Sequence, residues 1–250
     1  MLYCNPNMFP MSPKYIQQKE NGHADPIDSI RYQHQTGQLN WLTTKTRPDI
    51  AYAVGHLQRQ NATPDKNDLE AYKSLVRYLK KSKQYGIKLG KNHEEGLKVY
   101  VDASFNDNPD GKSTEGHVIM YAGAPISWSS KKQTFVSTSS TISEFTAFTE
   151  AIKEAIWVKQ LLVALGIEKE GAIPIYSDSI NALELLKKEG YSKSTRWVDN
   201  KYFYIRDELN KGTIEIHWIE GNKNPADGFT KPLERVKFEM FKDLVGMEEI

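Results

Sequence analysis

Four acidic residues of this sequence lie where strands are expected to end or helices to begin. Asp102 and Asp178 each follow a short apolar run, whereas Glu144 and Asp227 lie near expected helix starts. Carboxylates gathered in one place repel one another and raise one another's pKa unless cations neutralise them. Four convergent acids therefore predict bound divalent metal, and oxygen-only ligands favour Mg²⁺ or Mn²⁺. This arrangement indicates metal-assisted phosphodiester hydrolysis.

Three of the four acids also have a plainer interpretation as helix caps. Glu144 lies three residues after Thr141, the spacing of a capping box, and Asp227 lies three residues after Asn224 with a proline between them. Asp178 precedes another expected helix start. A single such acid is more often a cap, worth about 1 kcal/mol, than a metal ligand. Asp102 has no such alternative, because turn residues and a further strand follow it.

Alternating strand and helix patterns surround these acids. Three consecutive strands joined by turn-forming residues predict an antiparallel meander, and the helices that follow predict crossovers to further strands. The fold class is therefore α/β, with a mixed sheet flanked by helices. The expected strands are 97–101, 117–122, 125–129, 173–177 and 213–219, and the expected helices are 143–165, 179–188, 195–211, 225–233 and 236–244.

The sequence pattern divides the chain into three parts. Residues 1–29 are rich in proline, asparagine and glutamine and predict an extended or disordered arm. Residues 30–95 show helical periodicity and predict a small helical subdomain, with a linker at residues 86–96. Residues 96–250 form the α/β domain that carries the four acids.

Composition excludes several classes of protein. No apolar stretch approaches the roughly 20 residues of a membrane span, no secretory signal is visible, and the single cysteine excludes an internal disulfide. The six histidines occur without zinc-site spacing, so zinc is not expected. The net charge of +1 hides an asymmetry, because residues 1–95 carry 14 Lys and Arg against 9 Asp and Glu. A basic half of this kind suits contact with a nucleic-acid backbone, but the excess is mild and a merely solvated surface is the favoured explanation.

Several longer motifs stand out in the α/β part of the chain. They are Tyr100-Val101-Asp102-Ala103, Ile126-Ser127-Trp128-Ser129-Ser130-Lys131-Lys132-Gln133, Ser139-Ser140-Thr141-x-x-Glu144-Phe145, Tyr176-x-Asp178 and Ala226-Asp227-x-x-Thr230-Lys231-Pro232-Leu233. Together they resemble a known family, the RNase H domain of copia-type LTR retrotransposon Pol polyproteins. The resemblance is dense over residues 96–246, and residues 42–54 resemble the segment that connects reverse transcriptase to that domain. It implies an RNase H-like fold with a five-stranded sheet, two metal ions bound by Asp102, Glu144, Asp178 and Asp227, and the RNA strand of an RNA/DNA hybrid as substrate.

The sequence also departs from that family's pattern. No polymerase motif occurs, so we expect a C-terminal fragment that does not synthesise DNA. The family commonly has Lys-His-Ile-Asp where residues 196–199 read Arg-Trp-Val-Asp, and Ser104 replaces a second acid. The segment before Asp227 lacks the mobile histidine of cellular RNases H. Hybrid recognition through groove shape and ribose 2′-hydroxyls would fall to five polar residues: Ser104, Asn106, Ser179, Asn181 and Arg196.

Two other functions stay open beside ribonuclease H. One is a non-catalytic, host-retained module that binds nucleic acid or protein, and the other is an integrase- or exonuclease-like use of the same fold. Expected partners are the RNA/DNA hybrid and either a second copy of the chain or reverse-transcriptase and transposon proteins. The expected location is cytoplasmic or nuclear, within a retrotransposon particle in some contexts.

Overall fold

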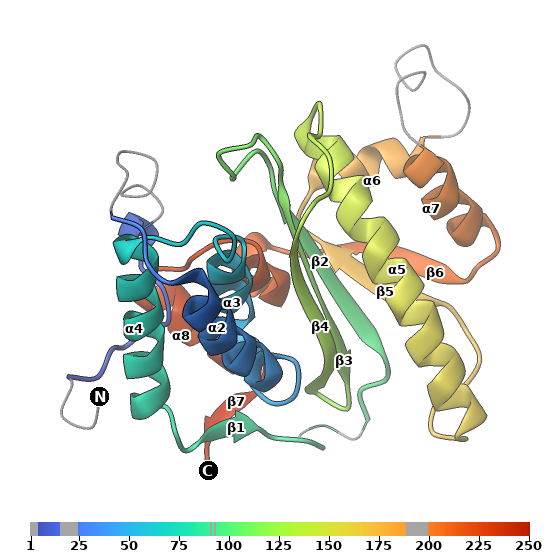
Figure 1. Cartoon of the computed structure of the whole chain (residues 1–250). Coiled ribbons are helices and arrows are strands. Elements are labelled where there is room, and N and C mark those ends of the chain that lie inside the picture. The colour runs from blue at the N-terminus through green and yellow to red at the C-terminus, as the bar shows by residue number, and fades with distance from the viewer. Residues whose placement is uncertain (1–4, 16–24, 91, 93, 189–199) are drawn as a thin grey trace. The chain divides into compact units, whose positions relative to one another are not determined.

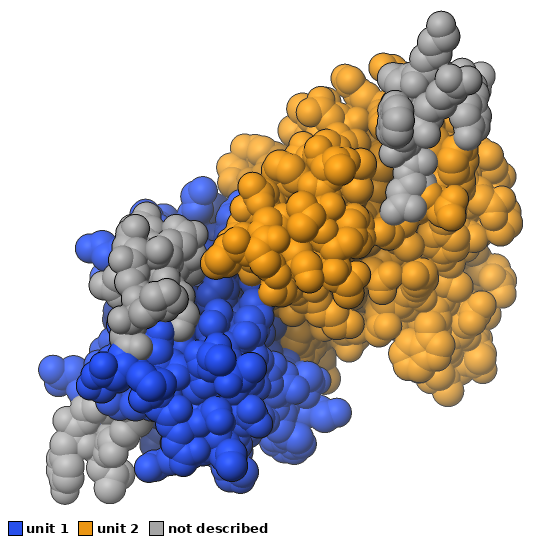
Figure 2. Space-filling view, turned by 45° about the horizontal axis from the view of Figure 1, so that its top comes forward, with its two compact units in different colours: residues 1–88, 231–250 blue, residues 89–230 orange. Residues whose placement is uncertain are grey.

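The computed structural model describes residues 5–15, 25–90, 92, 94–188 and 200–250. It divides into two compact units, coloured separately in Figure 2. Unit 1 contains residues 1–88 and 231–250, and unit 2 contains residues 89–230. The boundary at residue 88 lies inside the predicted linker, but the last 20 residues belong with the N-terminal part and not with the α/β domain, as the predicted boundary of 96–250 had placed them.

Unit 2 is built on a mixed five-stranded sheet in the order β4-β3-β2-β5-β6. Strands β2, β3 and β4 form the predicted antiparallel meander, and β5 and β6 continue from β2 in parallel. The α/β class and the mixed sheet are therefore confirmed. The strands are β2 Lys98–Ser104, β3 Thr114–Tyr121, β4 Ala124–Lys132, β5 Ile173–Ser177 and β6 Ile214–Trp218.

Three helices pack on one face of this sheet and supply most of its core (Figure 1). The longest, α5, contacts β2 and β3, and it also packs against α6 and α7. Strand residues Val99 and Val101 and helix residues Phe148 and Ile152 are fully buried between these layers. The helices are α5 Ser140–Ala164, α6 Ile180–Lys187 and α7 Asn200–Asn210, and two short 3-10 turns, η3 Gly221–Lys223 and η4 Pro225–Phe229, follow β6.

Unit 1 is mainly helical and is closed by the C-terminal segment. Strand β1 near residue 86 pairs antiparallel with β7 at the C-terminus, and Phe238 of α8 packs edge-on against Tyr78 of α4 with ring centroids 5.5 Å apart. Neither short strand was predicted. The elements are α2 Ser29–Thr43, η1 Pro48–Ile50, α3 Ala51–Gln58, α4 Lys66–Lys81, β1 Tyr85–Ile87, α8 Arg235–Leu244 and β7 Met247–Glu249.

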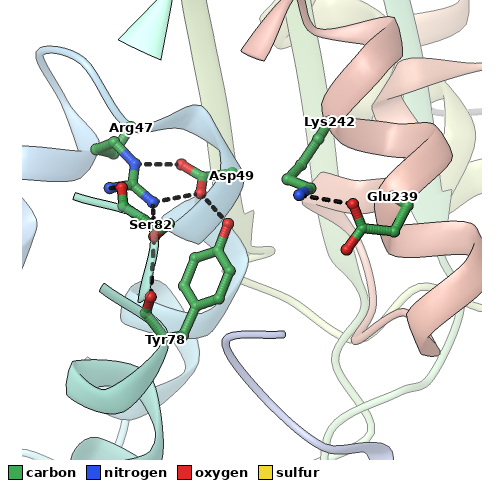
Figure 3. Close-up of polar contacts among 6 residues, drawn as sticks. All are labelled: Arg47, Asp49, Tyr78, Ser82, Glu239 and Lys242. Atoms are coloured by element: carbon green, nitrogen blue, oxygen red, sulfur yellow. Dashed lines mark hydrogen bonds and ion pairs between the residues drawn. The ribbon is translucent and has the colours of Figure 1, made fainter. Parts of the chain in front are cut away.

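A buried ion pair joins η1 to the end of α4 (Figure 3). The Arg47 guanidinium makes two bonds to the Asp49 carboxylate, at 2.8 and 2.7 Å, and a third to the Ser82 carbonyl oxygen at 3.1 Å. The Tyr78 hydroxyl donates to the same carboxylate at 2.5 Å. Because both charges are paired and hydrogen-bonded, their burial is tolerated, whereas removal of one partner typically costs about 3–5 kcal/mol. The Arg-Pro-Asp motif therefore has a structural role in unit 1.

Residues 5–15, a described part of the predicted N-terminal arm, pack against helix α4 within unit 1. Met11 and Tyr15 are buried, and the Tyr15 hydroxyl donates to Asp68 of α4 at 2.5 Å. The side-chain amide of Asn7 donates to the Ser74 carbonyl oxygen at 3.2 Å. Residues 5–15 are thus tied to α4, unlike the extended arm that their composition predicts, because two apolar side chains and two side-chain donors find partners there.

Candidate active site

Asp102 lies inside strand β2 and not after its end. The predicted strand ends at Val101, but the ladder continues through Ser104, which pairs with Thr114, and Asp102 pairs with Gly116 of β3. Side chains alternate between the two faces of a strand, so Asp102 faces away from the helical layer that Val101 contacts. The carboxylate is buried, with the residue only 6% exposed.

The segment from η4 to Thr230 covers this carboxylate. The Thr230 hydroxyl, which is fully buried, donates to Asp102 Oδ2 at 2.5 Å. Gly116 makes the approach possible, because a Cβ atom there would lie 2.6 Å from Cβ of Phe229. On the next strand, the Ser130 hydroxyl donates to the Phe229 carbonyl oxygen at 2.6 Å. One row of residues across β2, β3 and β4 therefore receives the segment that carries Asp227.

Asn224 joins this segment to the backbone of β2 and to the residue after β5. Its side-chain amide lies 3.1 Å from the Val101 carbonyl oxygen and 3.4 Å from Asp178 Oδ1. Its amide oxygen accepts the backbone N–H of Ala226 at 3.0 Å, which caps η4. A single buried side chain therefore contacts Asp178 and the β2 backbone beside Asp102, and it caps the turn that contains Asp227.

The cap interpretations of the acids have different outcomes. Glu144 is not a capping-box residue, because helix α5 begins earlier, at Ser140, and the hydroxyl of Ser139 caps it by accepting the Ile142 N–H at 3.3 Å. Asn224 does cap η4, as its sequence pattern predicts, and Asp227 lies at the third position of that turn. Asp178 precedes the cap position of α6, which has no side-chain capping bond.

Asn224 and Thr230 link the segments that carry Asp102, Asp178 and Asp227. Asp102 and Asp178 lie near the carboxyl ends of the adjacent parallel strands β2 and β5, and Asp227 is brought to β2 through Asn224 and Thr230. Glu144 is buried in α5, which packs on the opposite face of the sheet from η4. Across the described residues, which include all four acids, no group of three or more possible ligands has the geometry to hold a metal ion. Their all-oxygen donor set matches the chemistry of Mg²⁺ or Mn²⁺.

Four of the five predicted substrate-contact residues lie beside these strand ends. Ser104 is half-buried two residues after Asp102, and Ser179 is half-buried directly after Asp178. Asn106 and Asn181 are exposed, one in the turn after β2 and the other in α6. Arg196 lies outside the described residues. The contact roles of all five stay predictions.

Burial shifts the pKa values of three groups near the site. The pKa of Tyr100, on the same face of β2 as Asp102, is raised to about 12 because burial disfavours the phenolate, and its ring stacks on that of Tyr176 at 5.2 Å. On the helical face of β3, burial lowers the pKa of His117 to about 4 and raises the pKa of Glu115. His117 is therefore neutral near pH 7, which allows it to lie in the core.

Sequence analysis missed the roles of three residues that build this site. Thr230 stands in a quoted motif without a role, Gly116 was given no role, and Asn224 was recognised as a cap only. Their partners lie up to 128 residues away in sequence, and local spacing does not carry that information. The one local signal was the Asn-Pro pair that starts η4.

Pol polyproteins of plant transposons are similar in sequence to this chain. No family model matches the chain. The Retrovirus-related Pol polyprotein from transposon TNT 1-94 of Nicotiana tabacum is 36% identical over 238 residues, which are 95% of this chain and 17% of that protein. The corresponding polyprotein from transposon RE1 of Arabidopsis thaliana is 32% identical over 251 residues, again covering 17% of its length. The chain therefore spans about one sixth of these relatives.

Among the solved structures that match part of the chain is that of LC11-RNase H1 in complex with RNA/DNA hybrid. It is 17% identical, covers 54% of this chain and 93% of its own, and has a TM-score of 0.41. No helix in the described part of the chain is long and apolar enough to cross a membrane.

Proposed function

Because this chain belongs to the family of retrovirus-related Pol polyproteins from transposons, we propose that unit 2 is a ribonuclease H. Its substrate would be the RNA strand of an RNA/DNA hybrid, and its cleavage would be endonucleolytic. The copia-type motifs around Asp102 and Asp227 support this assignment at the level of sequence. The chain covers only part of its relatives, so the proposal concerns this domain and not the whole polyprotein.

The observation that carries the proposal is the meeting of three distant segments around two acids. Asp102 accepts a hydrogen bond from Thr230, and Asp178 lies within reach of the Asn224 amide. These contacts hold Asp102 in the last half of β2 and Asp178 directly after β5, toward the carboxyl ends of adjacent parallel strands, where ligand sites of open α/β sheets usually lie. A fold stabilised only by its core has no need to bury one of those carboxylates against a turn.

The proposed cofactor is a pair of divalent cations, Mg²⁺ or Mn²⁺. Asp102, Glu144, Asp178 and Asp227 would hold them. Bound cations supply Lewis-acid stabilisation of the charge that develops on the phosphate and its departing 3′ oxygen. The protein contributes orientation: Thr230 fixes the Asp102 carboxylate, and Asn224 fixes Asp178 relative to β2.

Recognition of the hybrid would use polar groups next to these acids. Ser104 and Asn106 follow Asp102, whereas Ser179 and Asn181 follow Asp178, so the four lie at the same strand ends. Hydroxyl and amide groups suit hydrogen bonds to ribose 2′-hydroxyls, which distinguish RNA from DNA. We further propose that the domain acts beside reverse-transcriptase and transposon proteins or as a homodimer, in the cytoplasm, the nucleus or a retrotransposon particle.

The proposal is tested with purified protein, Mg²⁺ or Mn²⁺, and end-labelled RNA in three forms: hybridised to DNA, paired with RNA, and single-stranded. We expect cleavage of the hybrid alone. Asp102→Asn removes one charge from the site and should lower the rate by about a thousandfold, since metal stabilisation is worth several kcal/mol. Glu184→Gln, which neutralises an exposed acid on α6, is the matched control and should retain full rate.

Two results would count against the proposal. The acids would have no catalytic role if the hybrid stayed intact at every metal concentration. The same conclusion would follow if Asp102→Asn cut the hybrid as fast as the natural chain. Tight binding of hybrid without cleavage would support the non-catalytic module instead.

A further inference from the structure

A basic and aromatic pocket lies within unit 1, between helices α2 and α4. Its volume is about 530 Å³, within the usual range of about 300–1,000 Å³ for small-molecule sites. Ile27 is one of the lining residues, and the backbone near it is tied to the start of α4. Ile27 N–H donates to the Pro64 carbonyl oxygen at 3.1 Å, and Lys66 N–H donates to that of Asp25 at 3.0 Å.

Its charged side chains leave a surplus of positive charge. Arg31, Lys73 and Arg77 line the pocket, and Asp28 is the one acid among the lining residues. The Asp28 carboxylate already accepts the N–H groups of Ile30 and Arg31 as the cap of α2. Lys73 is paired with Glu70 at 2.5 Å, but neither arginine has a carboxylate partner among the described residues. Nε of Arg77 is buried and has no acceptor in the part of the chain that the structure describes.

The pocket is also lined by an apolar and an aromatic side chain of α4 that are not buried in the core of unit 1. The buried residues of α4 are Asp68, Ala71, Leu75 and Tyr78. Leu69 and Tyr72 are only half-buried and line the pocket. An apolar wall with an aromatic ring beside unpaired guanidinium groups is suited to a ligand that has both a planar face and an anionic group.

We propose that this pocket binds a nucleotide unit of a nucleic-acid strand. Its phosphate would be held by Arg31 and Arg77, and its base would lie against Tyr72 and Leu69. Guanidinium groups bind phosphate in a bidentate manner, and aromatic rings stack on bases without sequence preference. This site lies in unit 1 and acts independently of the carboxylates of unit 2, so it adds a strand-binding site to the proposed nuclease.

Single-stranded DNA is the appropriate probe, because a ribonuclease H does not cleave it. Binding of a fluorescein-labelled oligothymidylate to the full chain is measured by anisotropy over a range of salt concentrations. Arg77→Gln and Arg31→Gln should each weaken binding about tenfold, the usual worth of a charge-assisted hydrogen bond. Each should also reduce the slope of log affinity against log salt by about one.

Lys45→Gln is the matched control, since it removes one exposed positive charge from unit 1 outside the pocket. It should change affinity less than twofold. Arg31 is exposed, so its replacement does not threaten folding, and an unchanged melting temperature checks this for both arginine variants.

Competition with adenosine 5′-monophosphate and with unlabelled oligonucleotide identifies the source of the nucleotide. Displacement by the mononucleotide would show that a free nucleotide fills the pocket, and displacement by the oligonucleotide alone would show that a strand is required. Equal affinities of the arginine variants and the Lys45 control would overturn the proposal. Loss of hybrid cleavage in Asp102→Asn with unchanged DNA binding would show that the two sites are separate.

Discussion

Thr230 shows how much of the site depends on one hydroxyl group. It is fully buried, donates to Asp102, and also lies 3.1 Å from the Asp227 carbonyl oxygen. A hydrogen bond from a hydroxyl to a carboxylate fixes the orientation of that carboxylate. Thr230 is thus a positioning residue that links two of the acids without being one of them.

Thr230→Val keeps the shape of the side chain and removes the donor. If Thr230 orients Asp102, kcat for hybrid cleavage should fall about tenfold with KM little changed, since one such bond is worth about 1.5 kcal/mol. Thr230→Ser retains the hydroxyl and should restore most of the rate. A valine variant with the full rate, or a serine variant as slow as the valine variant, would contradict a role of the hydroxyl group.

His117 makes stability depend on pH. Its folded-state pKa is about 4 and its ordinary value 6.5, chiefly because burial disfavours the charged ring; Lys131 of β4 lowers it further and Glu150 of α5 opposes this. The unfolded chain therefore binds a proton that the folded chain excludes. The stability that the neutral His117 ring contributes is fully present above pH 6.5 and is lost as pH falls toward 4. The free energy of unfolding should therefore fall by about 2 kcal/mol between pH 7.5 and pH 5.

His117→Gln removes this titration. Urea unfolding followed by tryptophan fluorescence at pH 7.5 and 5 should show a smaller pH dependence of the free energy of unfolding in the variant than in the natural chain. Burial raises the pKa of Glu115, so this residue makes the fold more stable as pH falls, opposite to His117. Both proteins contain Glu115, so its contribution to the pH dependence cancels in the comparison. An identical pH dependence in the two proteins would contradict the burial argument.

At the scale of elements, the close contact between η4 and β3 depends on the absence of a side chain at Gly116. Gly116→Ala places a methyl group 2.6 Å from Cβ of Phe229 and should push η4 away from the sheet. We expect a loss of about 1–3 kcal/mol in stability, as for other overpacked sites, together with slower hybrid cleavage.

Gly37→Ala provides the control for this substitution. Gly37 lies within α2 with nothing near its Cβ position, so alanine there should stabilise the helix by up to about 1 kcal/mol. Thermal melts and cleavage rates of both variants test the contrast. A Gly116→Ala protein as stable and as active as the Gly37→Ala protein would refute the close-contact argument.

The elements that sequence predicts well are those with strong local patterns. Strand β5 matches its predicted range, and the meander and α5 are found with ends shifted by a few residues. Strand β2 is longer than predicted because Ala103 and Ser104 pair with β3. This pairing joins separate segments of the chain, so local sequence patterns do not reveal it. Strands β1 and β7 have three residues each and pair across about 160 positions, so no local periodicity reveals them.

At the scale of the whole molecule, the C-terminal segment completes unit 1. Phe238, Phe241 and Met247 are buried, and Lys242 pairs with Glu239 at 2.7 Å (Figure 3) while its ammonium group lies 4.4 Å from the Tyr85 ring centre. Sequence analysis placed residues 231–250 with the sheet because they follow it directly in the chain. Assigning them to unit 1 required knowledge of contacts with residues 78–88.

Deleting residues 231–250 should therefore destabilise unit 1 selectively. Loss of two buried phenylalanines exposes the surface around Tyr78, and each such loss costs about 3–5 kcal/mol. Amide hydrogen exchange should show faster exchange in α4 and β1, with the amides of β2, β3 and β4 still protected. Faster exchange confined to the sheet of unit 2 would show that the segment belongs there instead.

We propose above all that Asp102 in β2 and Asp178 after β5 support cation-dependent hydrolysis of hybrid RNA. The most direct test is the single-turnover cleavage rate of an RNA/DNA hybrid measured against Mg²⁺ concentration, for the natural chain and for Asp102→Asn. The account predicts a saturable rise in rate for the natural chain and almost none for the variant. Cleavage that is independent of Mg²⁺, or equal in the two proteins, would contradict it.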